Sequence, residues 1–389
     1  MIPTPFDLIS YDDLLTLRDN GVSESKALEY KRGLPDNSDK AKHAFLAAVA
    51  SFANTDGGDL LYGIDARDGI PVAIPGIGVV IADQLKLRLE SMIRSGIEPR
   101  LPKLELKLIP VPGGEVLLVR VAKSWAAPHR VTVRDSGPFY ARHSSGKFEM
   151  DVAELRVAFA LSDAIAQRIE DFRNDRVGRI LEYRTPVPIH VGCKMAVHII
   201  PLSAFAGRNQ IDMRFYSEQL RQFHPLGRTQ FQNSTINLEG IVDYTNPDAE
   251  GKSHAYTQIF RAGIVEAVEV FAGGETKKDI HSRYYEQHAW NAVQRYLGLL
   301  GQMDVSAPFY VYLSFIDLTG YRFIVPNDGF GFFPRLPDRN IILLPEIVLT
   351  DPTVPAFESL RPAFDMVWNA FGYSGSQNYD EQGNWIEKD

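Results

Sequence analysis

Two glutamates and a lysine lie close together near the start of the chain, and an aspartate follows them after a double-glycine turn. They are Glu24, Glu29, Lys31 and Asp65, with the turn at 57–58. Carboxylate oxygens suit Mg²⁺ or Mn²⁺, and such a cation can lower the pKa of a water molecule and neutralise charge on a phosphate. Lys31 could stabilise charge that develops on a phosphate under attack. The pattern predicts a metal site with Glu24, Glu29 and Asp65 as ligands; the alternative is that the glutamates are surface charges paired with neighbouring lysines.

The elements expected around these residues are a strand, a helix and a second strand. A short strand fits 27–31, where Glu29 and Lys31 face one side and Leu28 and Tyr30 face the other. Because positions five apart on a regular strand face opposite sides, we expect Glu24 on the preceding turn. A helix at about 38–52 and a buried strand at 59–64 follow.

The whole chain predicts an α+β or α/β protein of two domains. The expected organisation is a layered domain at 1–160, a connecting helix at 161–185, a second α+β domain at 186–373 and a loose polar tail at 374–389. Further helices are expected at 8–20, 80–95, from about 151, at 279–300 and at 356–371. Further strands are expected at 103–110, 115–122, 138–142, 190–201, 308–316, 321–325 and 340–349, with hairpin-like runs at 235–244 and 255–270.

Composition narrows the classes of function. The chain has 389 residues, of which 45% are hydrophobic and 23% charged, and a formal net charge of −8, which argues against a general nucleic-acid coat. The N-terminus does not resemble a signal peptide and no apolar run approaches membrane-spanning length, so we expect a cytoplasmic protein with no membrane partner. Cys193 is the only cysteine, which leaves oxygen or imidazole ligands for any metal. No GxxxxGK[ST] motif is present, and ATP is not expected.

The motifs together carry a resemblance to a known family. Glu24-x4-Glu29-x-Lys31, Phe52-Ala-Asn-Thr-x-Gly-Gly58, Gly63-Ile-Asp65 and Gly137-Pro-Phe-Tyr-Ala-Arg142 occur in this order. The set resembles the Schlafen-type Alba-2 domain over roughly residues 8–160, and no family suggests itself for 185–389. The Schlafen branch includes metal-dependent RNA endonucleases that cut tRNA and rRNA. The resemblance implies metal binding by Glu24, Glu29 and Asp65, with Lys31 nearby, although many relatives are described only as nucleic-acid-binding or regulatory.

Five further residues are candidates for nucleic-acid contact: Lys26, Arg32, Asn54, Arg142 and Lys147. Arginine in this fold could bind phosphate through two hydrogen bonds, and the alternative for Arg142 is a buried structural ion pair. The turn at 54–58 could present N–H groups to a phosphate, or its glycines could simply allow a tight helix-to-strand connection.

The leading hypothesis is a divalent-metal-dependent endoribonuclease that acts on structured RNA such as tRNA and works as a homodimer. A role in antiviral defence or stress response is implied by the family resemblance alone. One alternative is a non-catalytic nucleic-acid-binding or transcription-regulatory module. Another is a regulatory protein that senses a ligand through its C-terminal domain.

Overall fold

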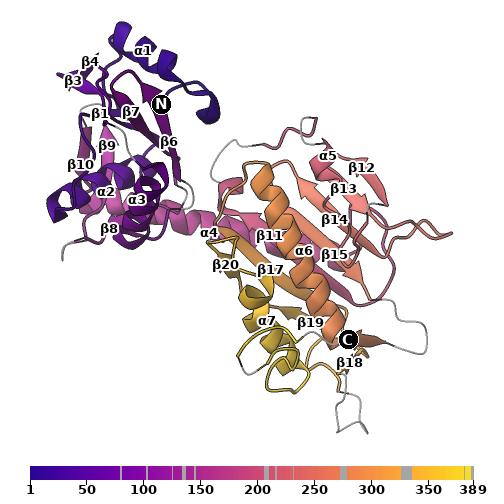
Figure 1. The fold of residues 1–389 in the computed structure, drawn as a ribbon. Coiled ribbons are helices and arrows are strands. Elements are labelled where there is room, and N and C mark those ends of the chain that lie inside the picture. Colours follow the sequence, from indigo (N-terminus) through magenta and orange to yellow (C-terminus); the bar gives the residue numbers. More distant parts are fainter. Residues whose placement is uncertain are drawn as a thin grey trace. The chain divides into compact units, whose positions relative to one another are not determined.

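A computed structural model describes residues 1–78, 81–101, 104–124, 126–133, 137–143, 146–205, 210–214, 217–230, 232–271, 278–325, 335–380 and 382–386. The chain divides into two compact units, Met1–Ala164 and Ile165–Asp389, and each has its own hydrophobic core. Both units mix helices with sheets, so the expected α+β class is confirmed (Figure 1).

The first unit is organised around a four-stranded sheet. Its strand order is β1 (Leu28–Lys31), β2 (Gly58–Tyr62), β7 (Gly114–Val121) and β6 (Leu104–Val111). Strands β1 and β2 are parallel, and helix α2 (Asp39–Ala53) connects them. Strand β7 is antiparallel to both of its neighbours. Strand β1 therefore lies at the edge of this sheet.

Each face of this sheet is covered by different helices. Helix α2 and helix α3 (Ala82–Gly96) pack with Leu60 and Tyr62 on one face. Helix α1 (Tyr11–Asp19) packs with Leu61 on the other face, together with Leu28 and Tyr30. Because side chains alternate between the two faces of a strand, Glu29 and Lys31 must face α2, opposite Leu28 and Tyr30. The predicted alternation of side chains along 27–31 is thus confirmed. The predicted start of α2 is confirmed as well, since the Ser38 hydroxyl accepts a hydrogen bond from Ala41 N.

Short hairpins and pairs complete the first unit. Strand β3 (Asp65–Arg67) pairs with β4 (Ile70–Ala73), β5 (Ile97–Glu98) with β8 (Arg130–Val131), and β9 (Tyr140–His143) with β10 (Gly146–Glu149); a 3-10 turn, η1, covers Phe6–Leu8. Strands β9 and β10 both contact α2. This contact brings a hairpin that is far along the chain to the side of the sheet that Glu29 faces.

Helix α4 (Val152–Leu181) runs without a break across the division between the units. The separate connecting helix expected at 161–185 is therefore the later part of one longer helix. Residues 152–181 contain no proline and no capping pattern that would end one helix and begin another, which explains why a single helix forms.

The second unit is built on an eight-stranded antiparallel sheet. Its order is β12 (Asn233–Ile236), β13 (Gly240–Tyr244), β14 (Ala255–Phe260), β15 (Val265–Val270), β11 (Lys194–Pro201), β17 (Phe309–Ile316) and β19 (Ile341–Leu343), and β20 (Ile347–Leu349) also pairs with β17. The single strand expected at 340–349 is thus two short strands. Outside this sheet lie η2 (Leu202–Phe205), α5 (Ser217–Leu220) and the parallel pair β16 (Asp279–His281) and β18 (Arg322–Ile324).

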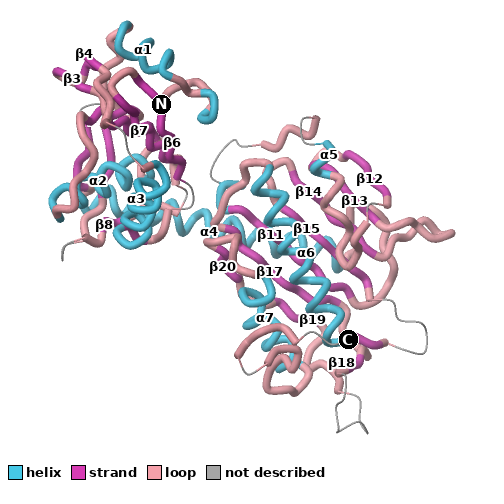
Figure 2. The backbone as a smooth tube through the Cα atoms, in the orientation of Figure 1, coloured by secondary structure: helices cyan, strands magenta, loops and turns pink. Residues whose placement is uncertain are grey.

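Two helices cover one face of the large sheet. Helix α6 (Ser282–Gln302) and helix α7 (Ala356–Ala370) share a core with β11 and β17, and Figure 2 shows α6 lying across the strands. The end of α4 covers the other face, where Val177 and Ile180 pack on Val242 and Val268.

The expectation of a loose tail at 374–389 is wrong for the described part of that segment. Tyr379 is buried and Trp385 packs against Trp290, with ring centroids 5.9 Å apart. Ser376 donates a hydrogen bond of 2.9 Å to the buried carboxylate of Glu286. Two aromatic side chains and one buried acceptor are enough to hold an otherwise polar segment on the unit. Residues 381 and 387–389 lie outside the described residues.

Candidate nucleic-acid interface

A buried carboxylate, Glu29, lies at the centre of the candidate site. Only 5% of Glu29 is exposed. Arg142 Nη1 donates to Glu29 Oε2 at 2.5 Å, and Lys31 Nζ lies 2.7 Å from Glu29 Oε1. Burial raises the pKa of Glu29, but the charges and hydrogen bonds of Lys31 and Arg142 outweigh burial, and the net pKa is lowered. Glu29 is therefore an ionised carboxylate at neutral pH, and each of its oxygens contacts a cation.

Arg142 reaches Glu29 from strand β9 and is itself buried. Its guanidinium carbon lies 4.1 Å from the centroid of the Phe52 ring. Its backbone N donates to Thr55 Oγ1 at 3.0 Å, which fixes the strand beside the end of α2. The side chain is 3% exposed, so it does not reach the surface. We therefore assign Arg142 to the buried structural ion pair that the sequence left open, and do not retain it as a phosphate contact.

Glu24 lies outside strand β1, on the turn before it, as the five-residue spacing predicted. Its backbone N donates to the Gly69 carbonyl at 2.7 Å, which ties the turn to the β3–β4 hairpin. Its Oε1 accepts a hydrogen bond of 2.8 Å from Tyr30 N. Because β1 is an edge strand, this carboxylate satisfies a backbone N–H that the sheet leaves free.

Two lysines lie at the exposed side of the Glu29 pair. The Lys31 side chain is 45% exposed. Lys147 comes from strand β10, where it is paired with Arg142 of β9, and it is exposed. Partial desolvation lowers the pKa of Lys147, while Glu29 and Glu24 raise it and the nearby charges of Lys31 and Arg142 lower it further. Lys31, Lys147 and the two glutamates thus act on one another electrostatically.

Asp65 and Arg32 form a second, more exposed pair next to this group. Gly63 N and Ile64 N both donate to the Lys31 carbonyl, so the chain leaves β2 beside the end of β1. Arg32 Nη1 and Asp65 Oδ2 are 3.9 Å apart, and about half or more of each side chain is exposed. A pair of this kind contributes little to stability, and Arg32 stays accessible to a phosphate.

The three expected metal ligands do not form a metal centre in this structure. Across the described ranges, no group of three or more His, Cys, Asp or Glu side chains could hold a metal ion. Both Glu29 oxygens contact cations, Glu24 binds a backbone N–H, and Asp65 faces Arg32. A divalent cation at Glu29 would take the place that the Lys31 ammonium holds. The arrangement present therefore does not fit Mg²⁺ or Mn²⁺.

Asn54 and Lys26 have partners within the protein. Asn54 Nδ2 donates to the carbonyls of His129 and Tyr140 at 2.8 and 2.9 Å, and its Oδ1 accepts from His129 N at 2.7 Å. Asn54 thus joins the end of α2 to β8 and β9, and we do not retain it as a nucleic-acid contact. Lys26 Nζ lies 2.6 Å from Asp56 Oδ2 in an exposed pair.

Glycine occupies both positions of the turn at 57–58 because a side chain at either position would clash with neighbouring atoms. Gly57 has a φ of 74°, and a Cβ there would lie 2.7 Å from Lys123 N and Val121 O. A Cβ on Gly58 would lie 2.3 Å from the Phe52 ring. These contacts support the tight helix-to-strand connection, the alternative that the sequence left open.

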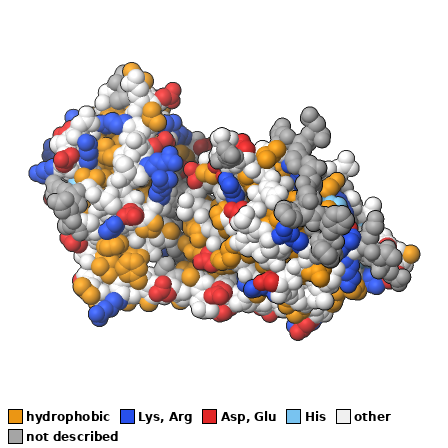
Figure 3. All heavy atoms as spheres, turned by 90° about the horizontal axis from the view of Figure 1, so that it is seen from below, with side chains coloured by type: hydrophobic (Ala, Val, Ile, Leu, Met, Phe, Trp, Pro, Cys, Tyr) orange, Lys and Arg blue, Asp and Glu red, His pale blue; other side chains and the backbone are white. Residues whose placement is uncertain are grey.

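Sequence reasoning did not identify the residues that hold Arg142. Phe52 supplies the ring beneath the guanidinium and Ser51 Oγ lies 3.4 Å from Nη1. Phe52 is the first residue of the motif at 52–58, which was a signal for a special role. Its spacing from the other apolar residues of α2 indicated only that it belongs to the hydrophobic core. Figure 3 shows lysine and arginine side chains interspersed with acidic ones on the face in view, which agrees with the net charge of −8.

Comparison with known protein families identifies the domain type of the first unit. The family model described as Schlafen, AlbA_2 matches residues 24–151. The chain therefore carries a Schlafen AlbA_2 domain, as the motifs predicted, and this family indicates a nucleic-acid-related function. The second unit lies outside the matched range.

Two solved structures are similar to part of the chain. One is the N-terminal domain of a RecG-related protein from Nitrosomonas europaea, with 26% identity, 35% of this chain and 88% of that chain covered, and a TM-score of 0.28. The other is the DIP2311 protein from Corynebacterium diphtheriae, with 21% identity, 37% and 27% covered, and a TM-score of 0.25. No curated protein is similar enough to count as a match. Among the described helices, none is both long and apolar enough to cross a membrane.

Proposed function

We propose that the first unit binds RNA through its phosphates, and that Lys31, Lys147 and Arg32 are the residues that contact them. The observation that carries the proposal is that both lysines lie beside the buried Glu29–Arg142 pair: Lys31 contacts Glu29, and Lys147 is paired with Arg142 across strands β9 and β10, within the range that the family model matches. The ion pair fixes β1 and β9, and so it holds the two lysines on a rigid support. Ammonium groups held in place contact phosphates at a lower cost in side-chain entropy than free ones.

Binding through phosphates would depend on salt more than on sequence. Each phosphate that a lysine neutralises releases condensed counterions, and contributes about 0.7 to 0.9 to the slope of log K against log salt. Loss of one contact should then weaken binding by about tenfold near 50 mM salt. Arg32 should contribute less than the lysines, because Asp65 lies beside it.

The test compares tRNA binding by the full chain and by single variants. Fluorescence anisotropy with labelled tRNA should show weaker binding for Lys31→Gln and for Lys147→Gln. Lys107→Gln is the matched control, because Lys107 lies on β6, at the opposite edge of the four-stranded sheet from β1, and its Nζ donates to the Phe6 and Asp7 carbonyls. Equal affinities for all four proteins would contradict the proposed surface.

Metal-dependent cleavage of structured RNA such as tRNA is a second and finer proposal, and it requires Lys31 to move away from Glu29 so that Mg²⁺ or Mn²⁺ can take its place as cofactor. Its support is that Glu24, Glu29 and Lys31 lie together in a domain whose family resemblance includes nucleases. We rank it below binding because the carboxylates already contact cations and N–H groups within the protein. We therefore derive no catalytic step for it.

A cleavage assay separates the two proposals. Full-length protein is incubated with total tRNA and either cation, beside an EDTA lane and the variant Glu29→Gln, and the products are resolved on a denaturing gel. Discrete fragments that need the cation and Glu29 would favour the nuclease. Intact tRNA in every lane, together with salt-dependent binding, would leave the binding function alone.

The homodimer expected from the sequence is also a proposal. Light scattering coupled to size exclusion, at several protein concentrations, measures it directly against the monomer mass of 43.6 kDa.

A further inference from the structure

A cavity with several polar side chains in its lining lies in the second unit, between helix α6 and residues 227–229. Its volume is about 540 Å³, within the range of about 300 to 1,000 Å³ that is typical of small-molecule sites. The residues of α6 that line it include Gln287, His288, Asn291 and Arg295. They are spaced by three or four positions, so they share one face of the helix.

The cavity holds more positive charge than the described side chains compensate. Arg228 Nη1 lies 3.8 Å from Glu269 Oε1, and His288 Nδ1 lies 2.8 Å from Glu269 Oε2. Arg295 has no carboxylate partner among the described side chains; its Nη2 lies 3.5 Å from the His224 carbonyl O, and its guanidinium carbon lies 5.2 Å from the Tyr296 ring centroid. Arg295 Nε is buried and has no hydrogen-bond partner in the described part of the chain. The guanidinium charge of Arg295 is therefore not compensated by a carboxylate of the described residues.

A glycine shapes the wall opposite α6. Gly227 has a φ of 73°, and a Cβ there would lie 2.5 Å from Glu269 Oε1 and 2.7 Å from His288 Nδ1. The missing side chain lets the backbone approach the Glu269–His288 pair closely. Arg228 follows directly, and its Nη1 donates to the Gly227 carbonyl at 3.2 Å. The two arginines thus reach the cavity from two different elements.

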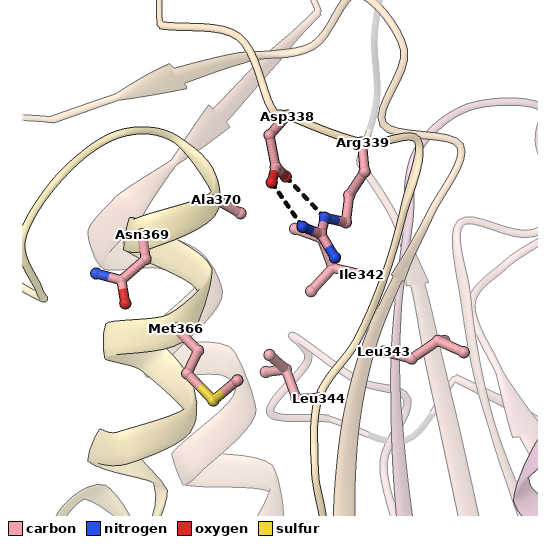
Figure 4. Close-up of a pocket in the computed structure, with 8 residues that line it drawn as sticks. All are labelled: Asp338, Arg339, Ile342, Leu343, Leu344, Met366, Asn369 and Ala370. Carbon is pink, nitrogen blue, oxygen red and sulfur yellow. Dashed lines mark hydrogen bonds and ion pairs between the residues drawn. The ribbon is translucent and has the colours of Figure 1, made fainter.

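A smaller cavity in the same unit provides a contrast. It has a volume of about 260 Å³ and is lined by residues that include Arg339, Ile342, Leu344 and Met366. In Figure 4, Arg339 and Asp338 point toward each other, and hydrogen bonds with nitrogen-to-oxygen distances of 2.7 and 2.9 Å join them. Asn369 and apolar side chains complete the lining. Its arginine is already neutralised, so the smaller cavity offers no charge to a ligand.

We infer that the larger cavity binds a small organic anion, with its phosphate or carboxylate group held by Arg295 and Arg228. Guanidinium groups bind both oxyanions through paired hydrogen bonds. Asn291 and Gln287 can donate to and accept from the polar body of the ligand. This site is separate from the RNA surface, and it gives a physical basis to the ligand-sensing role that the sequence left as an alternative.

Calorimetric titration of the full chain tests this inference. The probes are AMP, inorganic phosphate and succinate, with adenosine as the uncharged control. We expect at least one anion to bind while adenosine does not; AMP or phosphate would identify a phosphate site, and succinate a carboxylate site. Arg295→Gln and Arg228→Gln should each weaken that binding at least tenfold, whereas Arg339→Gln should leave it unchanged.

Two controls separate loss of anion binding from misfolding and from binding at the RNA surface. Arg228 is partly exposed, and its Nη1 makes a long contact with Glu269 and one hydrogen bond to the carbonyl of the neighbouring Gly227. Arg228→Gln should therefore fold even if Arg295→Gln does not, and circular dichroism checks both. Lys31→Gln/Lys147→Gln should bind the anion as the wild type does. The inference is overturned if no anion binds at millimolar concentration, if both cavity variants bind as the wild type does, or if the lysine variant alone loses binding.

Discussion

Replacement of Glu29 by glutamine should destabilise the first unit strongly, because it leaves Arg142 buried without a carboxylate. Both residues are almost fully buried. Removal of one partner of a buried ion pair costs about 3 to 5 kcal/mol, because the remaining charge is not compensated. Glutamine keeps one acceptor oxygen for Arg142, so we expect the lower end, about 3 kcal/mol.

Native-state hydrogen exchange of the full chain measures this effect within the first unit. The amides of β1 and β2 report on local unfolding of that sheet, so the second unit does not obscure the result. The matched control is Asp56→Asn, which removes an acid from an exposed pair with Lys26 and should change stability by less than about 1 kcal/mol. A double-mutant cycle with Arg142→Met should show that the two changes are far from additive.

The pH dependence of the same variant gives an independent check. The folded-state pKa of Glu29 is lowered from its ordinary value of 4.5, so its stabilising contribution is present above pH 4.5 and is lost as the pH falls through the folded pKa. The difference between wild type and Glu29→Gln should therefore be largest near pH 7 and shrink below pH 4.5. A Glu29→Gln protein as stable as Asp56→Asn at pH 7 would refute this reasoning.

Two further predictions concern other buried positions. Burial raises the pKa of Glu286 to about 7 even though hydrogen bonds from Trp368 and others lower it, so wild-type stability should fall as the pH rises from 4.5 to 7. Thermal unfolding of Glu286→Gln should lack this decline and leave the variant more stable than the wild type at pH 8; an unchanged pH profile would contradict the assignment. Gly57→Ala should cost about 1 to 3 kcal/mol, because its φ is positive and the new Cβ would meet Lys123 N, whereas Gly33→Ala has open space and should be neutral. Urea denaturation measures both glycine variants, and equal midpoints would count against the steric argument.

Local features of the first unit could be predicted from sequence because they depend on short-range geometry. The alternation in β1 follows from the two-residue period of a strand, and Glu24 had to leave the strand because five is an odd spacing. The start of α2 at Ser38 follows from its capping hydroxyl. The ordered motifs also identified the family, whose model covers 24–151.

Contacts between distant residues could not be predicted in the same way. Arg142 and Glu29 are 113 positions apart, and only the docking of β9 on α2 brings them together. Spacing identified carboxylates with the chemistry of metal ligands, but it did not reveal that Lys31 and Arg142 occupy both oxygens of Glu29. The tail was expected to be loose from its polar composition, although Tyr379, Trp385 and the hydrogen bond from Ser376 to Glu286 anchor its described part.

The salt dependence of tRNA binding shows whether Lys31 and Lys147 contact phosphates. Affinities of the wild type, Lys31→Gln/Lys147→Gln and the control Lys107→Gln are measured from 50 to 300 mM salt. We expect the double variant to lose about 1.4 to 1.8 from the slope of log K against log salt, about 0.7 to 0.9 for each phosphate contact, while Lys107→Gln keeps the wild-type slope. Identical slopes for all three proteins would contradict the claim that Lys31 and Lys147 form the nucleic-acid interface.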